Sequence, residues 1–262
     1  SFYFFFLVLF KIRFYQFIDI RKVFFYNIDP LLKTFCCLFI NGRGSAMDMA
    51  FVDYLTRFGH VLFGIVWIGL LYYFNFVQTE YFKEAEASAR VDAFAKLAPR
   101  ALWWFRWGAM ATFLTGVILL GYRHTGLTAD ITVGALMGTL MFLNVWLIIW
   151  PNQKIIVESN QGVLAGNEPN PDAAAAAPKA ALASRTNTLF SIPMLYFMGS
   201  SAHYASGSLV SNGTAVWICV AIIAALEANA IFGKQGPLTT VPGVIHCGLA
   251  LAVVLGLILN FV

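Results

Sequence analysis

Residues 131–153 read ITVGALMGTLMFLNVWLIIWPNQ, a stretch without any Asp, Glu, Lys or Arg. A helix needs about 20 mostly apolar residues to cross a hydrocarbon layer of about 30 Å. Apolar stretches with at most two charged residues recur along the chain, and the set covers residues 52–78, 101–122, 131–153, 185–203, 214–232 and 243–262. Lipid offers the backbone no hydrogen-bond partner, so such segments must be helical. The sequence therefore predicts an all-α fold, a polytopic membrane bundle of about six transmembrane helices.

The composition of the whole chain excludes an ordinary soluble protein. Hydrophobic residues make up 60% of the 262 residues and charged residues only 11%, whereas soluble domains carry about 25% charged residues. The mean hydropathy is +0.73. The main partner expected from these values is the lipid bilayer.

Residues 1–46 differ in composition from the rest of the chain. They hold six of the 17 Lys and Arg residues but two of the 13 Asp and Glu residues, so residues 47–262 carry eleven of each sign. We expect Met47 or Met49 to be the biological start and residues 1–46 to be an atypical extension without function; a signal peptide is the alternative. Residues 47–262 then form the membrane domain. Because this domain is neutral, no nucleic-acid partner is expected.

Basic residues gather on one side of the predicted bundle. The loops after the first, third and fifth helices, together with the adjoining helix ends, carry nine Lys and Arg residues, while the other side carries Arg57 and Arg123. The nine are Lys83, Arg90, Lys96, Arg100, Arg106, Lys154, Lys179, Arg185 and Lys234. Positively charged loops stay in the cytoplasm. We therefore expect the basic loops to be cytoplasmic.

Polar side chains within apolar helices are costly and mark functional sites. Toward the basic side every predicted helix contributes some: Asn75, Gln78, Arg106, Asn144, Asn152, Gln153, Arg185, Asn187, Glu227, Asn229 and His246. Arginine offers a bidentate fork, amides both donate and accept, and Glu or His can move a proton. This ring is a candidate site for a planar anion, with His246 as the nearest partner of Glu227 by depth. The alternative is a set of interhelical hydrogen bonds with arginines that reach the interface.

Tryptophans cluster near the same boundary. They include Trp103, Trp104, Trp107, Trp146 and Trp150. An aromatic belt at the membrane interface explains most of them. Stacking on a flat substrate is the alternative for one or two.

Three histidines, His60, His124 and His203, lie toward the opposite side. Two histidines that face each other across a bundle can hold a b-type haem. We predict cofactor ligation by His60 and His203, with His124 as a further candidate. Packing histidines, or a copper site, are the alternatives. No C-x-x-C-H motif occurs, so covalently attached haem is not expected.

Several spaced motifs carry a resemblance to a known family. They are WIG at 67–69, YFNFVQ at 73–78, FRW at 105–107, NVW at 144–146, WPNQK at 150–154, SRTN at 184–187 and IPM at 192–194. Residues 47–262 with these motifs resemble the membrane domain of the membrane-bound, cytochrome c-linked urate oxidases, also called urate hydroxylases. The resemblance implies a bacterial inner-membrane protein that oxidises urate and passes electrons to a c-type cytochrome, without producing hydrogen peroxide.

The resemblance assigns roles to the polar ring. Urate is expected to bind near Asn75, Asn144, Arg185 and Asn187, and the catalytic candidates are Arg106, Glu227 and His246. Full-length relatives carry a C-terminal cytochrome c domain that is not found in this sequence. We therefore expect either a separate c-type cytochrome as electron acceptor or a role beside other membrane subunits.

Two other function classes fit the same residues. An electron-relay or structural subunit of a larger respiratory complex would use the histidines without substrate chemistry. A small-molecule transporter would use the polar ring, although no internal repeat or clearly broken helix supports it.

Overall fold

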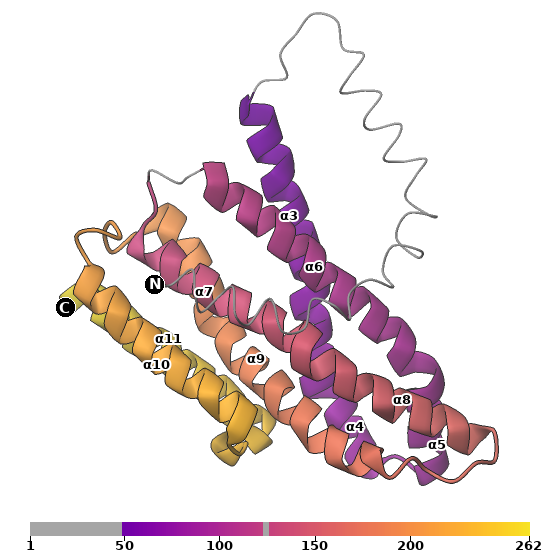
Figure 1. Cartoon of the computed structure of the whole chain (residues 1–262). Helices are drawn as coiled ribbons and strands as arrows, with labels where there is room; N and C mark the ends of the chain where they lie inside the picture. Colours follow the sequence, from indigo (N-terminus) through magenta and orange to yellow (C-terminus); the bar gives the residue numbers. More distant parts are fainter. Residues whose placement is uncertain (1–48, 123–125) are drawn as a thin grey trace, which may run out of the picture. The chain divides into compact units, whose positions relative to one another are not determined.

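The computed structural model describes residues 49–122 and 126–262. The predicted N-terminal extension and His124 lie outside the described residues. Within them the chain is mostly helical and forms no β-strand; Thr128 and Ser208 make an isolated bridge. The predicted all-α bundle is confirmed (Figure 1).

The helices follow one another with few residues between them. In chain order they are α3 (Met49–Tyr72), η2 (Tyr73–Gln78), α4 (Thr79–Glu84), α5 (Ala87–Asp92), η3 (Ala93–Leu97), α6 (Ala98–Tyr122), α7 (Ala129–Asn144), η4 (Val145–Ile149), α8 (Trp150–Leu164), α9 (Asp172–His203), α10 (Gly213–Phe232), η5 (Gly236–Thr239) and α11 (Val241–Phe261). The segments η2, η3 and η4 are π-helical turns, and η5 is a 3₁₀ turn. The π-helical turns do not break the helices that contain them.

Among the described residues, five continuous helices are long and apolar enough to cross a membrane. They span Met49–Glu84, Ala87–Tyr122, Ala129–Leu164, Gly213–Phe232 and Val241–Phe261, and each contains one of the predicted segments or nearly all of it. The predicted segment 185–203 is the second half of α9, which has the length but a more polar composition. The five apolar helices are compatible with a multi-pass membrane protein.

The reason for the polar composition of α9 is its surroundings. It packs against α7, α8, α10 and α11, and most residues between 176 and 200 are buried (Figure 1). The two helices come close together at Gly134 of α7, where a Cβ atom would lie 3.2 Å from the Cβ of Phe197. The side chains of α9 therefore meet protein rather than lipid, which lets a helix carry polar groups as long as they are paired.

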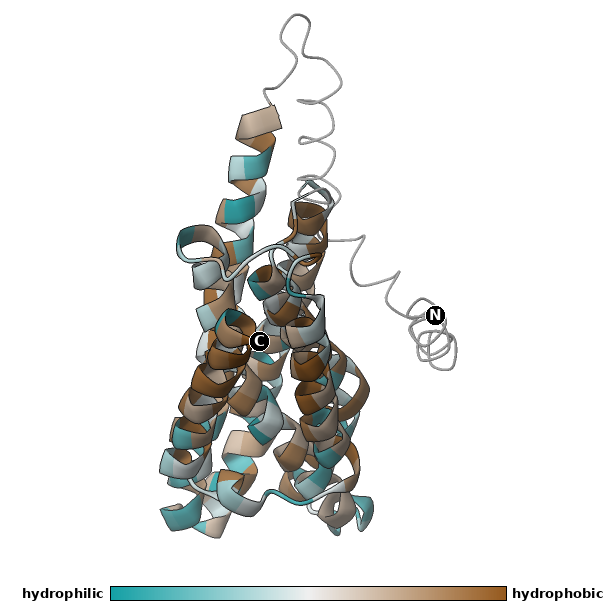
Figure 2. Cartoon of the chain, turned by 90° about the vertical axis from the view of Figure 1, so that its left-hand side faces the viewer, coloured by the Kyte–Doolittle hydropathy of each residue, from teal (hydrophilic) through white to brown (hydrophobic). Residues whose placement is uncertain are grey.

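The outward sides of the other helices are apolar. Exposed hydrophobic residues include Phe58 and Ile65 on α3, Trp217 on α10 and Val253 on α11. Figure 2 shows apolar residues along the lengths of the helices and hydrophilic residues gathered at their lower ends. A bundle with an apolar surface and polar ends suits a bilayer.

Candidate functional site

The centre of α9 carries the sequence SRTNTLFS at residues 184–191, and most of it is buried. Three of its hydroxyls bond to carbonyl oxygens of the same helix: Thr186 to Leu182, Thr188 to Ser184 and Ser191 to Thr188. Back-bonded hydroxyls of this kind satisfy themselves and need no other role. The informative groups of this stretch are therefore the side chains of Ser184, Arg185 and Asn187.

An amide–carboxylate cluster joins three helices. The Nδ2 of Asn144, at the end of α7, donates to Asn187 Oδ1 on α9 at 3.0 Å and to Glu227 Oε2 on α10 at 3.2 Å. Asn187 Nδ2 in turn donates to the carbonyl of Met141 at 2.9 Å. Asn144 and Asn187 are buried and Glu227 is partly buried. The cluster thus fixes two amides and presents one carboxylate.

The carboxylate of Glu227 has a different partner from the one expected. His246 lies near the start of α11, where it is exposed. The described residues give Glu227 its hydrogen bond from Asn144 and none from His246. Many residues lie at the same depth in the membrane, but only those on facing sides of neighbouring helices come into contact.

A second contact joins η2 to α9 beside Arg185. Asn75, in the π-helical turn, donates through Nδ2 to the carbonyl of Leu71 at 2.9 Å and to Ser184 Oγ at 2.8 Å. One turn earlier the hydroxyl of Tyr72 lies 3.0 Å from Ser191 Oγ. Because Ser191 already donates to Thr188, Tyr72 is the donor in that pair. π-Helical turns recur at functional sites, and this one carries a predicted site residue.

Arg185 is the least satisfied polar residue of α9. The residue is only 4% exposed, and its Nη1 atom is buried without a hydrogen-bond partner. Among the described residues it forms no ion pair, although Glu80 attracts it electrostatically. A guanidinium has five N–H donors and no acceptor. Arg185 therefore presents N–H donors inside the bundle that the described residues leave unused.

Arg106, on α6, meets an aromatic ring. Its guanidinium carbon lies 3.4 Å from the ring centroid of Trp150, the first residue of α8. Arg106 Nε is buried and has no hydrogen-bond partner among the described residues. The indole nitrogen of Trp67 on α3 is a further buried donor without one. These unpaired donors are all of the kind that binds oxygen acceptors.

Two of the three predicted ligand histidines, His60 and His203, lie in the described part of the chain. His60 Nδ1 lies 2.9 Å from the carbonyl of Thr112 and 3.1 Å from Thr115 Oγ1. A carbonyl only accepts, so Nδ1 carries the hydrogen and Nε2 keeps its lone pair. His203 is exposed at the end of α9. No group of three or more His, Cys, Asp or Glu residues that could hold a metal ion occurs in the described part of the chain.

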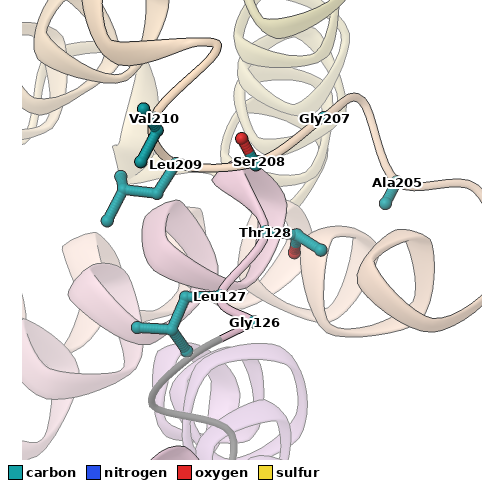
Figure 3. A pocket seen from close by; sticks show the side chains of 8 residues that line it. All are labelled: Gly126, Leu127, Thr128, Ala205, Gly207, Ser208, Leu209 and Val210. Atoms are coloured by element: carbon teal, nitrogen blue, oxygen red, sulfur yellow. The ribbon is translucent and has the colours of Figure 1, made fainter.

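A hollow lies at the loops between α6 and α7 and between α9 and α10. Figure 3 shows its lining, residues 126–128, 205 and 207–210, which includes none of the predicted site residues. Beside it Asp130, 1% exposed, accepts hydrogen bonds from Ser200 Oγ at 2.6 Å and from the Ser206 backbone N–H at 2.8 Å and Oγ at 3.2 Å. Asp130, Ser200 and Ser206 form the Asp130 cluster, which ties the start of α7 to the end of α9.

Comparison with models of known protein families gives a match over residues 122–255 to the urate oxidase N-terminal family. This chain belongs to the urate oxidase N-terminal family. The match covers 134 of the 262 residues, from the end of α6 into α11. No curated protein and no protein of known structure matches the chain.

The family region contains most of the described polar site. Asn144, Arg185, Asn187, Glu227 and His246 lie within it, whereas His60, Asn75 and Arg106 come from the helices before it. The structure brings the two sets together through the bonds of Asn75 to Ser184 and the stacking of Arg106 on Trp150. The family helices and the preceding helices therefore meet through polar side chains at these two places.

Sequence reasoning missed several members of this interior. Tyr72 and Ser184 gave no signal of their own, since single hydroxyls are common in apolar helices. The signal for Ser184 was its place beside Arg185 in a polar run within an otherwise apolar segment. Asp130 lies just before the predicted segment 131–153, and no pattern indicates the two serines that bind it.

Proposed function

We propose that this urate oxidase N-terminal family member binds urate as an anion and oxidises it, with a c-type cytochrome as the electron acceptor. The observation that carries the proposal is Arg185, a residue that is 4% exposed and whose Nη1 is buried without a hydrogen-bond partner, next to Ser184, which binds Asn75, in the interior of the bundle. A buried charge is tolerated when it is paired and hydrogen-bonded. An anionic substrate supplies that pairing.

The chemistry of urate suits the donors of this interior. Urate is a flat anion with carbonyl oxygens along its edges, and a planar guanidinium binds two adjacent acceptors at once. Asn75 uses only Nδ2 in its described bonds, so its Oδ1 is free to accept from a ring N–H. In this arrangement Arg185 supplies the positive charge, and Asn75 accepts a hydrogen bond from an N–H at the edge of the urate ring.

Glu227 is the proposed proton acceptor. Oxidation removes electrons from urate, and a proton leaves with them as water adds to the ring. The carboxylate of Glu227 is held by Asn144, which is held in turn by Asn187. A positioned carboxylate of this kind contributes about a hundredfold or more to a proton transfer.

The proposed setting is a bacterial inner membrane with the basic loops in the cytoplasm, by the charge asymmetry of the sequence. Electrons then leave toward the periplasmic side, where His60 lies on α3. His60 would be a ligand of a b-type haem, because a ligating histidine donates its other ring N–H to a carbonyl and Nε2 would remain for iron. Such a haem, when bound, supplies one-electron transfer.

Urate-dependent reduction of cytochrome c by the purified full chain in detergent tests the proposal. We expect reduction without hydrogen peroxide in the wild type, and a loss of about a hundredfold or more in Arg185→Ala, because one fixed charge orients the anion. Arg100→Ala, an exposed arginine at the start of α6, is the matched control.

Two results would contradict the proposal. One is equal turnover in the Arg185→Ala variant and the wild type. The other is uptake of labelled urate into vesicles without oxidation, which would make the chain a transporter. An optical spectrum of the reduced wild type tests the haem separately, since the absence of a b-type band would remove His60 as a ligand without affecting Arg185.

A further inference from the structure

Arg106 and Trp150 form a stacked pair between α6 and α8. The guanidinium carbon lies 3.4 Å from the centroid of the indole ring. At that separation two flat groups touch face to face, because a tilted guanidinium would drive one of its nitrogens into the ring. The stack therefore fixes the plane of the Arg106 guanidinium.

A stacked guanidinium keeps its hydrogen-bonding edge. All of its N–H groups lie in its own plane and point sideways, away from the ring on which it rests. Nε is buried and makes no hydrogen bond with the described residues. The adjacent Nε and Nη donors of such an arginine form a fork for two acceptors that lie in the same plane.

The position of Trp150 depends on an irregular turn. Asn144 and Trp150 lie on one continuous helix, Ala129–Leu164, and the π-helical turn Val145–Ile149 separates them. A π-helical turn has more residues per turn than an α-helix, so it rotates the following residues relative to the preceding ones. The turn thus aims Trp150 at α6 while Asn144 faces α9 and α10.

We propose that Trp150 is a positioning residue that holds Arg106 ready to bind the edge of a planar heterocyclic anion. The proposal rests on the proposed function, of which it names the recognition element. Its substrate class is a flat ring with two neighbouring in-plane acceptors, as in urate. Orienting the fork before binding removes much of the rotational freedom that an arginine otherwise loses.

The test compares four purified full-length proteins: wild type, Trp150→Phe, Trp150→Leu and Trp104→Leu. Trp104 is 59% exposed on α6, so its substitution controls for the loss of a tryptophan. Equilibrium dialysis with labelled urate and with labelled orotate, a second planar heterocyclic anion, gives Kd. Urate-dependent cytochrome c reduction gives kcat and KM.

We expect Trp150→Leu to raise both Kd and KM for urate about tenfold, with little change in kcat, because the stacking is lost while Arg106 remains. Trp150→Phe should keep most of the affinity, since a phenyl face still supports a guanidinium. Trp104→Leu should behave as the wild type.

The proposal is overturned if Trp150→Leu binds urate as tightly as the wild type. If the wild type binds orotate but not urate, urate is refuted as the substrate. If Trp150→Leu is then the one variant that loses affinity for orotate, the role of the stacked pair is supported. Wild-type protein that binds neither anion would overturn both proposals.

Discussion

Asp130 and Arg185 are two buried charged residues of this bundle, and they differ in their partners. Asp130 is 1% exposed and accepts three hydrogen bonds, from Ser200 and from Ser206. Arg185 is 4% exposed and forms neither a hydrogen bond nor an ion pair with the described residues. Burial alone therefore does not separate a structural charge from a binding charge. The count of partners does, because a satisfied group has nothing left to offer a ligand.

The largest effect on stability is expected at the satisfied charge. Asp130→Ala leaves the hydroxyl and backbone donors of Ser200 and Ser206 without their acceptor, so the free energy of unfolding should fall by about 3 kcal/mol. Unfolding of the detergent-solubilised chain by SDS measures it. Asp92→Ala removes an exposed carboxylate paired with Lys96 and is the control. A loss no greater than that of the control would show that the Asp130 cluster does not hold the two helices.

A smaller change, and one in turnover, is expected at Glu227. Glu227→Gln keeps an oxygen that accepts from Asn144 but can no longer take up a proton, so urate oxidation should fall about a hundredfold while urate binding is retained. Steady-state kinetics and equilibrium dialysis measure the two quantities. Glu158→Gln, an exposed carboxylate on α8, should change neither. Full turnover in Glu227→Gln would leave the cluster with a structural role.

The smallest effect on stability is expected at the unpaired charge. Arg185→Met replaces a buried guanidinium by an apolar chain of similar length, so the free energy of unfolding should be unchanged or rise by about 1 kcal/mol. The same SDS titration applies, with Arg100→Met as the exposed control. A fall in the free energy of unfolding as large as that of Asp130→Ala would mean that Arg185 has a structural partner, and Arg185 would then not differ from Asp130 in this respect.

Much of the fold follows from the sequence because lipid imposes a simple rule of length and apolarity. That rule predicted five of the spans and placed Asn144, Asn187 and Glu227 in one layer, where they hydrogen-bond. It could not tell which faces meet, so it paired Glu227 with His246. A π-helical turn also rotates the residues after it relative to those before it, and hydropathy does not reveal where such a turn lies.

The helix α9 is too polar to satisfy the same rule of length and apolarity, and its contacts explain why. Its polar groups are matched by α7, by η2 and by its own carbonyls, which are contacts made across the bundle rather than along a single segment. A sequence shows that such a helix is polar; it does not show where its partners come from.

The polarity of α9 also bears on how the chain is made. Apolar helices enter a bilayer singly as they leave the translocon, whereas polar side chains such as those of Arg185 and Asn187 raise the free energy of entry. Met141 and Asn144 on α7, synthesised earlier, offer Asn187 its hydrogen bonds. We therefore expect α9 to enter the membrane together with α7 during biosynthesis rather than alone. A substitution that weakens α7 against α9 would first appear as a failure of membrane integration.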